Sequence, residues 1–246
     1  MLSSEISEIL NCKACGGKDF EIKEVSIDSR AVQAPDSTLF FALKGVNHNG
    51  HDYVEELYER GVRHFVVSEE RKVFGSLAAA CYYRVENVLE ALQRLAAWHR
   101  GRMKGEIVAI TGSNGKTIVK EWLYQLLADE PGVYRSPRSY NSQVGVPLSL
   151  LGMEENTRLA FIEAGISQPG EMLRLQKMIR PRIGIFTHLG DAHGENFSSR
   201  GQKLSEKALL FSGCDCLIGR EGEVLEAVFA QVGPKVQRML WGESGE

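Results

Sequence analysis

The segment AITGSNGKTIVKEWL, residues 109–123, resembles a phosphate-binding loop between a strand and a helix but departs from the usual pattern. It places Gly112 and Gly115 between an apolar run and the start of an amphipathic helix. The common phosphate-binding loop, G-x-x-x-x-G-K-[ST], would need a glycine at position 110, where this chain has Ile110. The shorter G-S-N-G-K-T is therefore a chance match, a damaged nucleotide-binding loop or the loop of a separate class of ATP-dependent enzyme.

The physical properties of this loop favour phosphate binding. Its glycines let the backbone curl so that successive N–H groups point into one hollow, and the following helix adds its positive N-terminal end. Lys116 can reach phosphate oxygens, and the Thr117 hydroxyl can bind Mg²⁺. An ordinary glycine turn is the alternative, but G-K-T between a strand and a helix favours a nucleotide. The predicted cofactor-binding residues are Gly112, Ser113, Asn114, Gly115, Lys116 and Thr117.

Outward from the loop, strands and helices are expected to alternate. Apolar strands are predicted at 107–111, 159–163, 183–187, 216–218 and 236–240, and helices at 118–128, 171–179, 203–211 and 224–231. Continuous apolar strands joined by helical crossovers indicate a parallel sheet covered on both faces. Ligands bind such sheets at the carboxyl ends of the strands.

The first part of the chain has a different character. Strands are expected at 38–43 and 64–67, and helices at 53–60 and 88–102. We therefore predict an α/β protein with a small N-terminal domain, residues 1–103, joined at GRMKG to a P-loop-type parallel-sheet domain, residues 104–246. Because WGESGE follows directly on a strand, the second domain is expected to be truncated, and the chain to be the front part of a longer protein.

Composition excludes several functional classes. Hydrophobic residues make up 43% and the net charge is −3, which argues against global disorder and against a general nucleic-acid or membrane binder. No signal peptide or membrane span is expected. Five cysteines without framework spacing favour reduced thiols and a cytoplasmic location. Cys12 and Cys15 have the spacing of half a zinc ribbon but lack a second pair, so free thiols are favoured.

Candidate site residues follow later strands. Glu163 ends an otherwise apolar strand, and beside a phosphate loop it is expected to hold a hard cation rather than only cap the next turn. His193 follows the next strand, within GIFTHLGDAHGENF. Because imidazole is a poor ligand for Mg²⁺, His193 is expected to order a metal-bound water instead. Lys207 lies on the following helix, where spacing alone cannot distinguish it from a solvated lysine.

Taken in order, these segments resemble the Mur ligases. The resemblance rests on TGSNGKT (111–117), SYNSQVGVPLSLL (139–151), EAG (163–165), THLGDAHGENF (187–197) and EKALLF (206–211). The family uses the short T-G-x-N-G-K-T loop, so the resemblance identifies the loop as that of ATP-dependent amide-forming ligases. Residues 26–67 resemble the family's UDP-sugar-binding domain.

The resemblance implies roles for individual residues. The loop from Gly112 to Thr117 would bind ATP phosphates; Thr117 and Glu163 would hold one Mg²⁺, and His193 would help to hold a second. Lys207 matches a lysine that family members carry as a carbamate, an anionic oxygen ligand. The implied metal ligands are Thr117, Glu163, His193 and Lys207, the implied catalytic residues are Lys116, His193 and Lys207, and the implied substrate-binding residues are Ser29, Arg30 and Asn141.

Within the family, GVPLSLL points to the branch that adds D-alanyl-D-alanine. The implied reaction joins D-Ala-D-Ala to a UDP-N-acetylmuramoyl-tripeptide through an acyl phosphate, during peptidoglycan synthesis. Residues 136–149 and 163–172 are similar to versions of this ligase fused ahead of an alanine racemase, so a racemase domain is expected beyond the chain end.

Three alternatives remain open. The first is another Mur-type ligase, either diamino-acid-adding or similar to folylpolyglutamate synthase, although the folate enzyme usually has Gly-Lys-Gly-Ser where this chain has Gly-Lys-Thr. The second is a P-loop kinase or NTPase, which would leave the N-terminal domain without a purpose. The third is a non-catalytic binding module.

Overall fold

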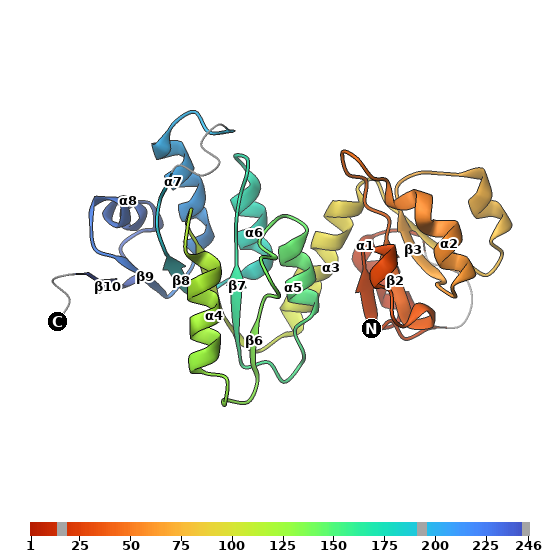
Figure 1. The fold of residues 1–246 in the computed structure, drawn as a ribbon, viewed down its shortest axis with the longest axis horizontal. Helices are drawn as coiled ribbons and strands as arrows, with labels where there is room; N and C mark the ends of the chain where they lie inside the picture. Colours follow the sequence, from red (N-terminus) through yellow and green to blue (C-terminus); the bar gives the residue numbers. More distant parts are fainter. Residues whose placement is uncertain (14–18, 191–195, 243–246) are drawn as a thin grey trace. The chain divides into compact units, whose positions relative to one another are not determined.

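The computed structural model describes residues 1–13, 19–190 and 196–242. The chain divides into two compact units, Met1–Trp98 and His99–Glu246, and the boundary falls within helix α3 (Val88–Arg102) (Figure 1). Each unit is built on a parallel sheet, which confirms the predicted α/β class. Among the helices of the described residues, none combines the length and apolar character needed to cross a bilayer.

The first unit contains a four-stranded parallel sheet in the order β1-β2-β3-β4. Its strands are β1 (Glu24–Ser26), β2 (Thr38–Phe41), β3 (His64–Val67) and β4 (Cys81–Arg84). Its helices are α1 (Ser3–Leu10) and α2 (Val54–Glu59), with short 3-10 turns η1 (Ser29–Ala31), η2 (Pro35–Ser37), η3 (Gly50–Tyr53) and η4 (Lys72–Ser76).

Alternation along the strands builds the core of this unit. Phe40 and Phe65 lie on one face of the sheet and share a cluster with Val54 and Leu57 of α2. Strand β2 ends at Phe41, two residues before its predicted end, because the Leu43 amide donates back to the Phe41 carbonyl at 2.8 Å.

The second unit contains a six-stranded parallel sheet in the order β10-β9-β8-β5-β7-β6. Its strands are β5 (Glu106–Thr111), β6 (Val133–Arg135), β7 (Leu159–Glu163), β8 (Ile183–Phe186), β9 (Cys216–Arg220) and β10 (Gln237–Trp241). Its helices are α4 (Lys116–Leu126), α5 (Gly145–Leu151), α6 (Glu171–Ile179), α7 (Arg200–Ala208) and α8 (Glu223–Val232), and η6 (Leu209–Phe211) continues α7.

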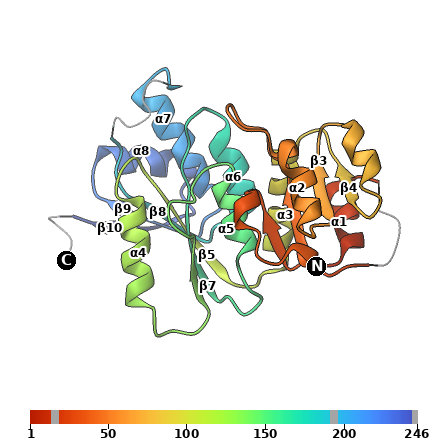
Figure 2. The ribbon, with the colours of Figure 1, turned by 45° about the vertical axis from the view of Figure 1, so that its right-hand side comes forward.

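Helices cover both faces of the larger sheet. Helix α4 packs on the face formed by Val108, Ile110 and Phe161, while α5 and α6 lie on the opposite side (Figures 1 and 2). Gly184 in β8 lets η6 approach closely, since a Cβ there would lie 2.2 Å from the Phe211 ring. The strands nearest the G-K-T loop, β7 and β8, flank β5 on either side. Their carboxyl ends therefore meet around that loop.

Several elements were missed by the sequence reasoning. They are α1, β1, β4, β6 and α5. Strands β1 and β6 have only three residues each, too few for a periodic pattern. Helix α5 is short and carries Pro147 in its first turn, where the missing N–H costs nothing.

The cysteines differ from the expectation of uniformly reduced thiols. Cys12, Cys214 and Cys216 carry free thiols, but Cys81 is disulfide-bonded, so the prediction is wrong for that residue. Burial raises the pKa of Cys214 to about 12, which keeps its thiol protonated and unreactive. Cys15 lies outside the described residues.

Candidate functional site

The loop between β5 and α4 has the geometry of an anion site. Gly112 and Gly115 have backbone φ angles of 149° and 82°, values that residues other than glycine rarely adopt. Gly115 is the N-cap of α4, and within the described part of the chain no side chain caps this helix. The first-turn N–H groups of a helix have no partner inside it, so here they are available to a bound phosphate.

The end of β8 fastens this loop in place. The Thr187 hydroxyl donates to the Asn114 carbonyl at 2.6 Å, and the Ser113 amide donates to the His188 carbonyl at 2.6 Å. A Cβ at Gly112 would lie 2.0 Å from Thr187 Oγ1. The loop conformation therefore depends on glycine at 112 and on this neighbouring strand end.

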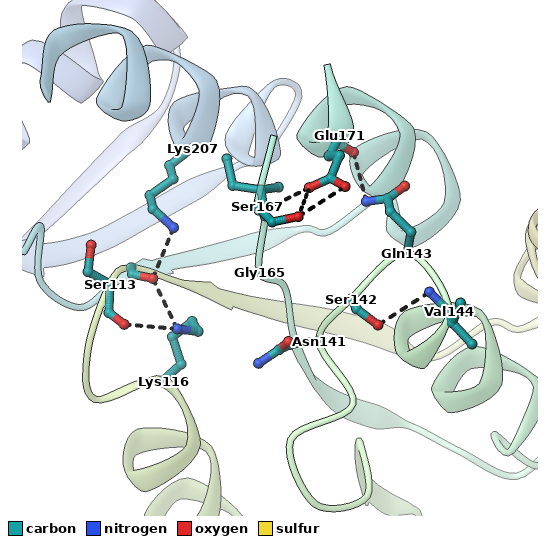
Figure 3. A pocket seen from close by; sticks show the side chains of 12 residues that line it. Ser113, Lys116, Asn141, Ser142, Gln143, Val144, Gly165, Ser167, Glu171 and Lys207 are labelled. Atoms are coloured by element: carbon teal, nitrogen blue, oxygen red, sulfur yellow. Dashed lines mark hydrogen bonds between the residues drawn. The ribbon is translucent and has the colours of Figure 1, made fainter. Parts of the chain in front are cut away.

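Two lysines from different helices converge on the loop. Lys116 Nζ and Lys207 Nζ each donate to the Gly112 carbonyl at 3.1 Å, and Figure 3 shows them approaching from α4 and α7. Burial lowers the pKa of Lys116, an effect that Glu163 partly offsets. Burial, reinforced by repulsion from Lys116 and Lys203, lowers the pKa of Lys207 to about 7. The site therefore holds positive charge that a bound anion would neutralise. It also holds the Lys207 amine, which is partly neutral near pH 7.

Glu163 connects three segments at the carboxyl end of β7. Its side chain is only 1% exposed. Glu163 Oε2 accepts a hydrogen bond from Thr117 Oγ1 at 2.9 Å, and Oε1 accepts one from Asn141 Nδ2 at 2.6 Å. A carboxylate beside a hydroxyl is a set of oxygen donors that suits a hard divalent cation, so the residues present fit the magnesium expected with a nucleotide.

A cavity of about 240 Å³ opens beside the loop. Its walls come from the loop, the segment 141–144, the turn after β7 and the start of α6 (Figure 3). Glu171 caps that turn by accepting from the Ser167 amide at 2.6 Å, and its own carbonyl accepts from Gln143 Nε2 at 3.2 Å. The cavity therefore has a polar wall next to the cationic loop.

Two predicted substrate-binding residues belong to the first unit. Ser29 and Arg30 lie in η1, which begins after a two-residue connection from β1. The Arg30 guanidinium donates twice to the Asp28 carboxylate, at 2.9 and 2.8 Å, and this pairing lowers the pKa of Asp28 to about 2. Asp28 thus fixes the orientation of an otherwise exposed arginine.

The structure brings together most of the predicted residues of the second unit. The loop residues, Glu163, Asn141 and Lys207 surround one site, whereas His193 lies outside the described residues and its role stays a prediction. The sequence placed Thr187 among the polar residues at strand ends but gave no role to its hydroxyl, which anchors the loop, and the sequence reasoning missed Lys120, which is fully buried beside Glu163. Their signals were a hydroxyl at a strand end and a lysine three residues after Thr117, on the same helix face.

Two family models match successive parts of the chain. The model described as "Mur ligase family, catalytic domain" matches residues 21–100, and the model described as "Mur ligase middle domain" matches residues 110–224. Together they account for most of the sequence. The chain belongs to the Mur ligase family. The G-S-N-G-K-T loop, Glu163 and Lys207 all fall inside the matched middle domain.

This Mur ligase chain is 30% identical over 213 residues to the UDP-N-acetylmuramoyl-tripeptide–D-alanyl-D-alanine ligase of Haemophilus influenzae, covering 85% of this chain and 45% of that protein. Among solved structures, MurF from Acinetobacter baumannii superposes with a TM-score of 0.85 at 24% identity, covering 99% of this chain and 53% of that one.

The MurF ligase of Thermotoga maritima in complex with ADP superposes with a TM-score of 0.79 at 25% identity, covering 91% of this chain and 51% of that one. The Mur ligase chain thus spans about half the length of the relatives that it matches.

Proposed function

We propose that this chain forms the UDP-sugar-binding and ATP-binding parts of a ligase that joins D-Ala-D-Ala to a UDP-N-acetylmuramoyl-tripeptide. Residues 1–103 would bind the UDP-muramoyl substrate through Ser29 and Arg30, and residues 104–246 would bind ATP and Mg²⁺. The observation that carries the proposal is the hydrogen bond from Thr117 to Glu163 beside the G-K-T loop. The choice of substrates is supported by the similarity to ligases that add D-alanyl-D-alanine to the UDP-N-acetylmuramoyl-tripeptide.

In this proposal the chain holds the nucleotide by its phosphates. The first-turn amides of α4 and the Lys116 ammonium would contact the phosphate oxygens, and Thr117 and Glu163 would hold the magnesium. Bound Mg²⁺ supplies a Lewis acid that neutralises charge on those oxygens. In the structure, Lys116 Nζ donates hydrogen bonds to the Gly112 and Ser113 carbonyls at 3.1 Å each. On nucleotide binding it would exchange these acceptors for phosphate oxygens.

The proposed chemistry needs no side-chain nucleophile. A carboxylate oxygen of the tripeptide would attack the γ-phosphorus of ATP. The bond between that phosphorus and the oxygen bridging to the β-phosphate would break, giving an acyl phosphate and releasing ADP. The D-Ala-D-Ala amine would then attack the acyl carbon, phosphate would leave, and the amine would lose a proton. Lys116 would offset the developing charge, while Asn141, fixed on Glu163 at 2.6 Å, would help to place the peptide.

Lys207 has the environment required for the proposed carbamate. A neutral lysine amine attacks CO₂ and releases one proton, and a pKa of about 7 makes the neutral form abundant near neutral pH. The resulting anion would offer oxygen donors to a metal beside Lys116. His193 would complete a second metal site in this proposal.

Two extensions go beyond the catalytic reaction. We propose a cytoplasmic role in cell-wall synthesis, which would affect cell shape and division, and a fused alanine racemase domain beyond residue 246. Depletion of the protein in its native cell should cause lysis that osmotic support relieves. The native polypeptide should interconvert L- and D-alanine, and a native protein without racemase activity would contradict the fusion.

Ligand-induced stabilisation tests the proposed function on this chain. Mg·ADP at about 100 times its Kd should raise the melting temperature by roughly 5 °C, because only the folded chain binds it. Lys116→Ala should abolish the shift, and UDP-N-acetylmuramoyl-tripeptide should stabilise the chain independently of Lys116. No shift with either ligand would contradict the proposal. A rate of ATP hydrolysis that does not change when the UDP-linked substrate is added would favour an NTPase instead.

A further inference from the structure

Lys120 is a charged side chain with no access to solvent. It lies on α4 with an exposure of 0%, and its ammonium donates to the Ser136 carbonyl at 2.9 Å and to the Arg138 carbonyl. Burying an ammonium is costly unless its donors are satisfied. The carbonyls of the segment after β6 therefore replace the water that Lys120 has lost, and they fix where its charge lies.

That charge lies next to the proposed magnesium ligand. Lys120 Nζ is 3.8 Å from Glu163 Oε2, the same oxygen that accepts the Thr117 hydroxyl. Thr117 and Lys120 are three residues apart on α4 and so present their side chains on one face of the helix. One helix thus supplies both the hydroxyl and the cation that Glu163 Oε2 faces.

The surroundings of Glu163 leave this carboxylate little freedom. Its other oxygen accepts from Asn141, and its backbone amide donates to Ser136 Oγ at 3.3 Å, in the same segment whose carbonyls hold Lys120. Glu121 is also 3.3 Å from Lys120 but is partly exposed and pairs with Arg135 at 3.0 Å. Lys120 is therefore the buried cation beside Glu163, and with Thr117 and Asn141 it surrounds the Glu163 carboxylate.

We infer that Lys120 is a positioning residue that holds Glu163 in the orientation required to share a magnesium ion with Thr117. Lys120 does not touch the nucleotide in this role; it acts through the carboxylate. Partners of this kind, behind the direct ligands, fix ligand geometry and contribute substantially to metal affinity. The inference rests on the proposed function, because it assumes that this site binds a magnesium nucleotide.

Calorimetric titration of the full chain with ADP, once with Mg²⁺ and once with EDTA, tests this role. The measured quantity is the magnesium gain, the ratio of the ADP affinity with Mg²⁺ to that with EDTA. Lys120→Gln keeps an N–H donor for the two carbonyls but removes the charge. We expect it to reduce the magnesium gain by about tenfold while leaving metal-free ADP binding unchanged. Lys120→Arg keeps the charge and should retain more of the gain.

A double-mutant comparison separates positioning from a merely structural role. In a Glu163→Gln background, Lys120→Gln should cause no further loss of the magnesium gain, because its effect passes through Glu163. The matched control is Lys177→Met, on the exposed face of α6, which should change neither affinity. Lys120→Met removes both the charge and the N–H donor and should also reduce the magnesium gain. Thermal unfolding without ligand shows whether each variant folds. If Lys120→Met does not fold, the magnesium gain of Lys120→Gln tests the positioning role.

Failure of the positioning role and failure of the proposed function would give different results. If the unmodified chain binds ADP but Lys120→Gln keeps the full magnesium gain, or loses affinity equally with EDTA, the positioning role is overturned and the proposed function stands. Additive losses in the double variant would also overturn it. If the unmodified chain binds no ADP under either condition, the proposed function fails and the role of Lys120 fails with it.

Discussion

The Thr117 hydroxyl and the Glu163 carboxylate, 46 residues apart in sequence, are joined by a hydrogen bond of 2.9 Å at the carboxyl edge of the larger sheet. The bond links the first turn of α4 to the last residue of β7. It places two oxygen ligands side by side, next to the loop that we propose binds phosphate. The proposed magnesium nucleotide site depends on this pair.

Removing the hydroxyl should therefore weaken magnesium-dependent binding selectively. Thr117→Val keeps the shape of the side chain but removes one proposed metal ligand, and we expect about a tenfold loss of ADP affinity with Mg²⁺. ADP affinity in EDTA should change little. Thr157→Val, a buried threonine near the opposite end of β7, is the control and should leave both affinities intact. Equal losses with and without Mg²⁺ would show that Thr117 serves the loop and not a metal.

The geometry of Gly112 predicts a strong effect of a single methyl group. Gly112→Ala would put Cβ 2.0 Å from Thr187 Oγ1 on a backbone with a φ of 149°, at a cost of about 1–3 kcal/mol for the backbone strain alone. We expect loss of ADP binding measured by calorimetry. Gly170→Ala shares a positive φ of 84° but has nothing within 4 Å, so this control should retain binding. Full binding by Gly112→Ala would contradict the described loop conformation.

Carbamate formation at Lys207 should follow the low pKa of its amine. Chains equilibrated with ¹³C-bicarbonate should show a carbamate signal by NMR that grows as the pH rises through about 7, because only the neutral amine attacks CO₂. Lys207→Met should lack the signal, whereas Lys177→Met should keep it. A midpoint near 10 would mean that burial and neighbouring lysines do not shift this amine.

The same pKa shift predicts a pH dependence of stability in CO₂-free buffer. Between pH 7 and the ordinary lysine pKa of 10.5, the unfolded chain holds a proton on Lys207 that the folded chain lacks. The contribution of Lys207 to stability should therefore rise with pH across this window. Denaturant unfolding of Lys207→Met should show a smaller rise than the unmodified chain. An identical pH profile for the two chains would contradict the assignment.

Arg30 should affect only the UDP-sugar ligand. Because Asp28 holds the guanidinium with two hydrogen bonds, Arg30→Ala should weaken UDP-N-acetylmuramoyl-tripeptide binding by about tenfold, the usual size for a charge-assisted contact. Binding of Mg·ADP should stay unchanged. The exposed Arg84→Ala, which loses only a surface pair with Glu70, is the matched control. Unchanged affinity for the UDP ligand would remove Arg30 from the proposed site.

The sequence predicted the parts of the site that follow from strand ends and loop chemistry. Glycines at 112 and 115 require special backbone angles, and the carboxyl ends of adjacent parallel strands share one edge, so Glu163 could be expected beside the loop. The alternation of apolar runs and amphipathic helices likewise located the longer strands and helices of the second unit.

Other features depend on tertiary packing and leave weak traces in the sequence. Along α4, Ile118, Trp122 and Leu126 recur at helical spacing, yet these side chains are 56%, 64% and 80% exposed, while Lys120 is completely buried. Periodicity alone would bury the apolar stripe and expose the lysine. The lysine is buried because the Ser136 and Arg138 carbonyls come from a segment whose path no local pattern reveals.

The decisive experiment for the proposed magnesium nucleotide site is a crystal structure of this chain with ADP and Mn²⁺, with the anomalous scattering of manganese measured to locate the ion. We predict that the ADP phosphates lie on the amides of Gly112 to Thr117. A manganese peak should lie within coordination distance of Thr117 Oγ1, with the Glu163 carboxylate in the inner or outer sphere of the ion. Phosphates bound elsewhere, or a manganese ion that contacts neither side chain, would contradict it.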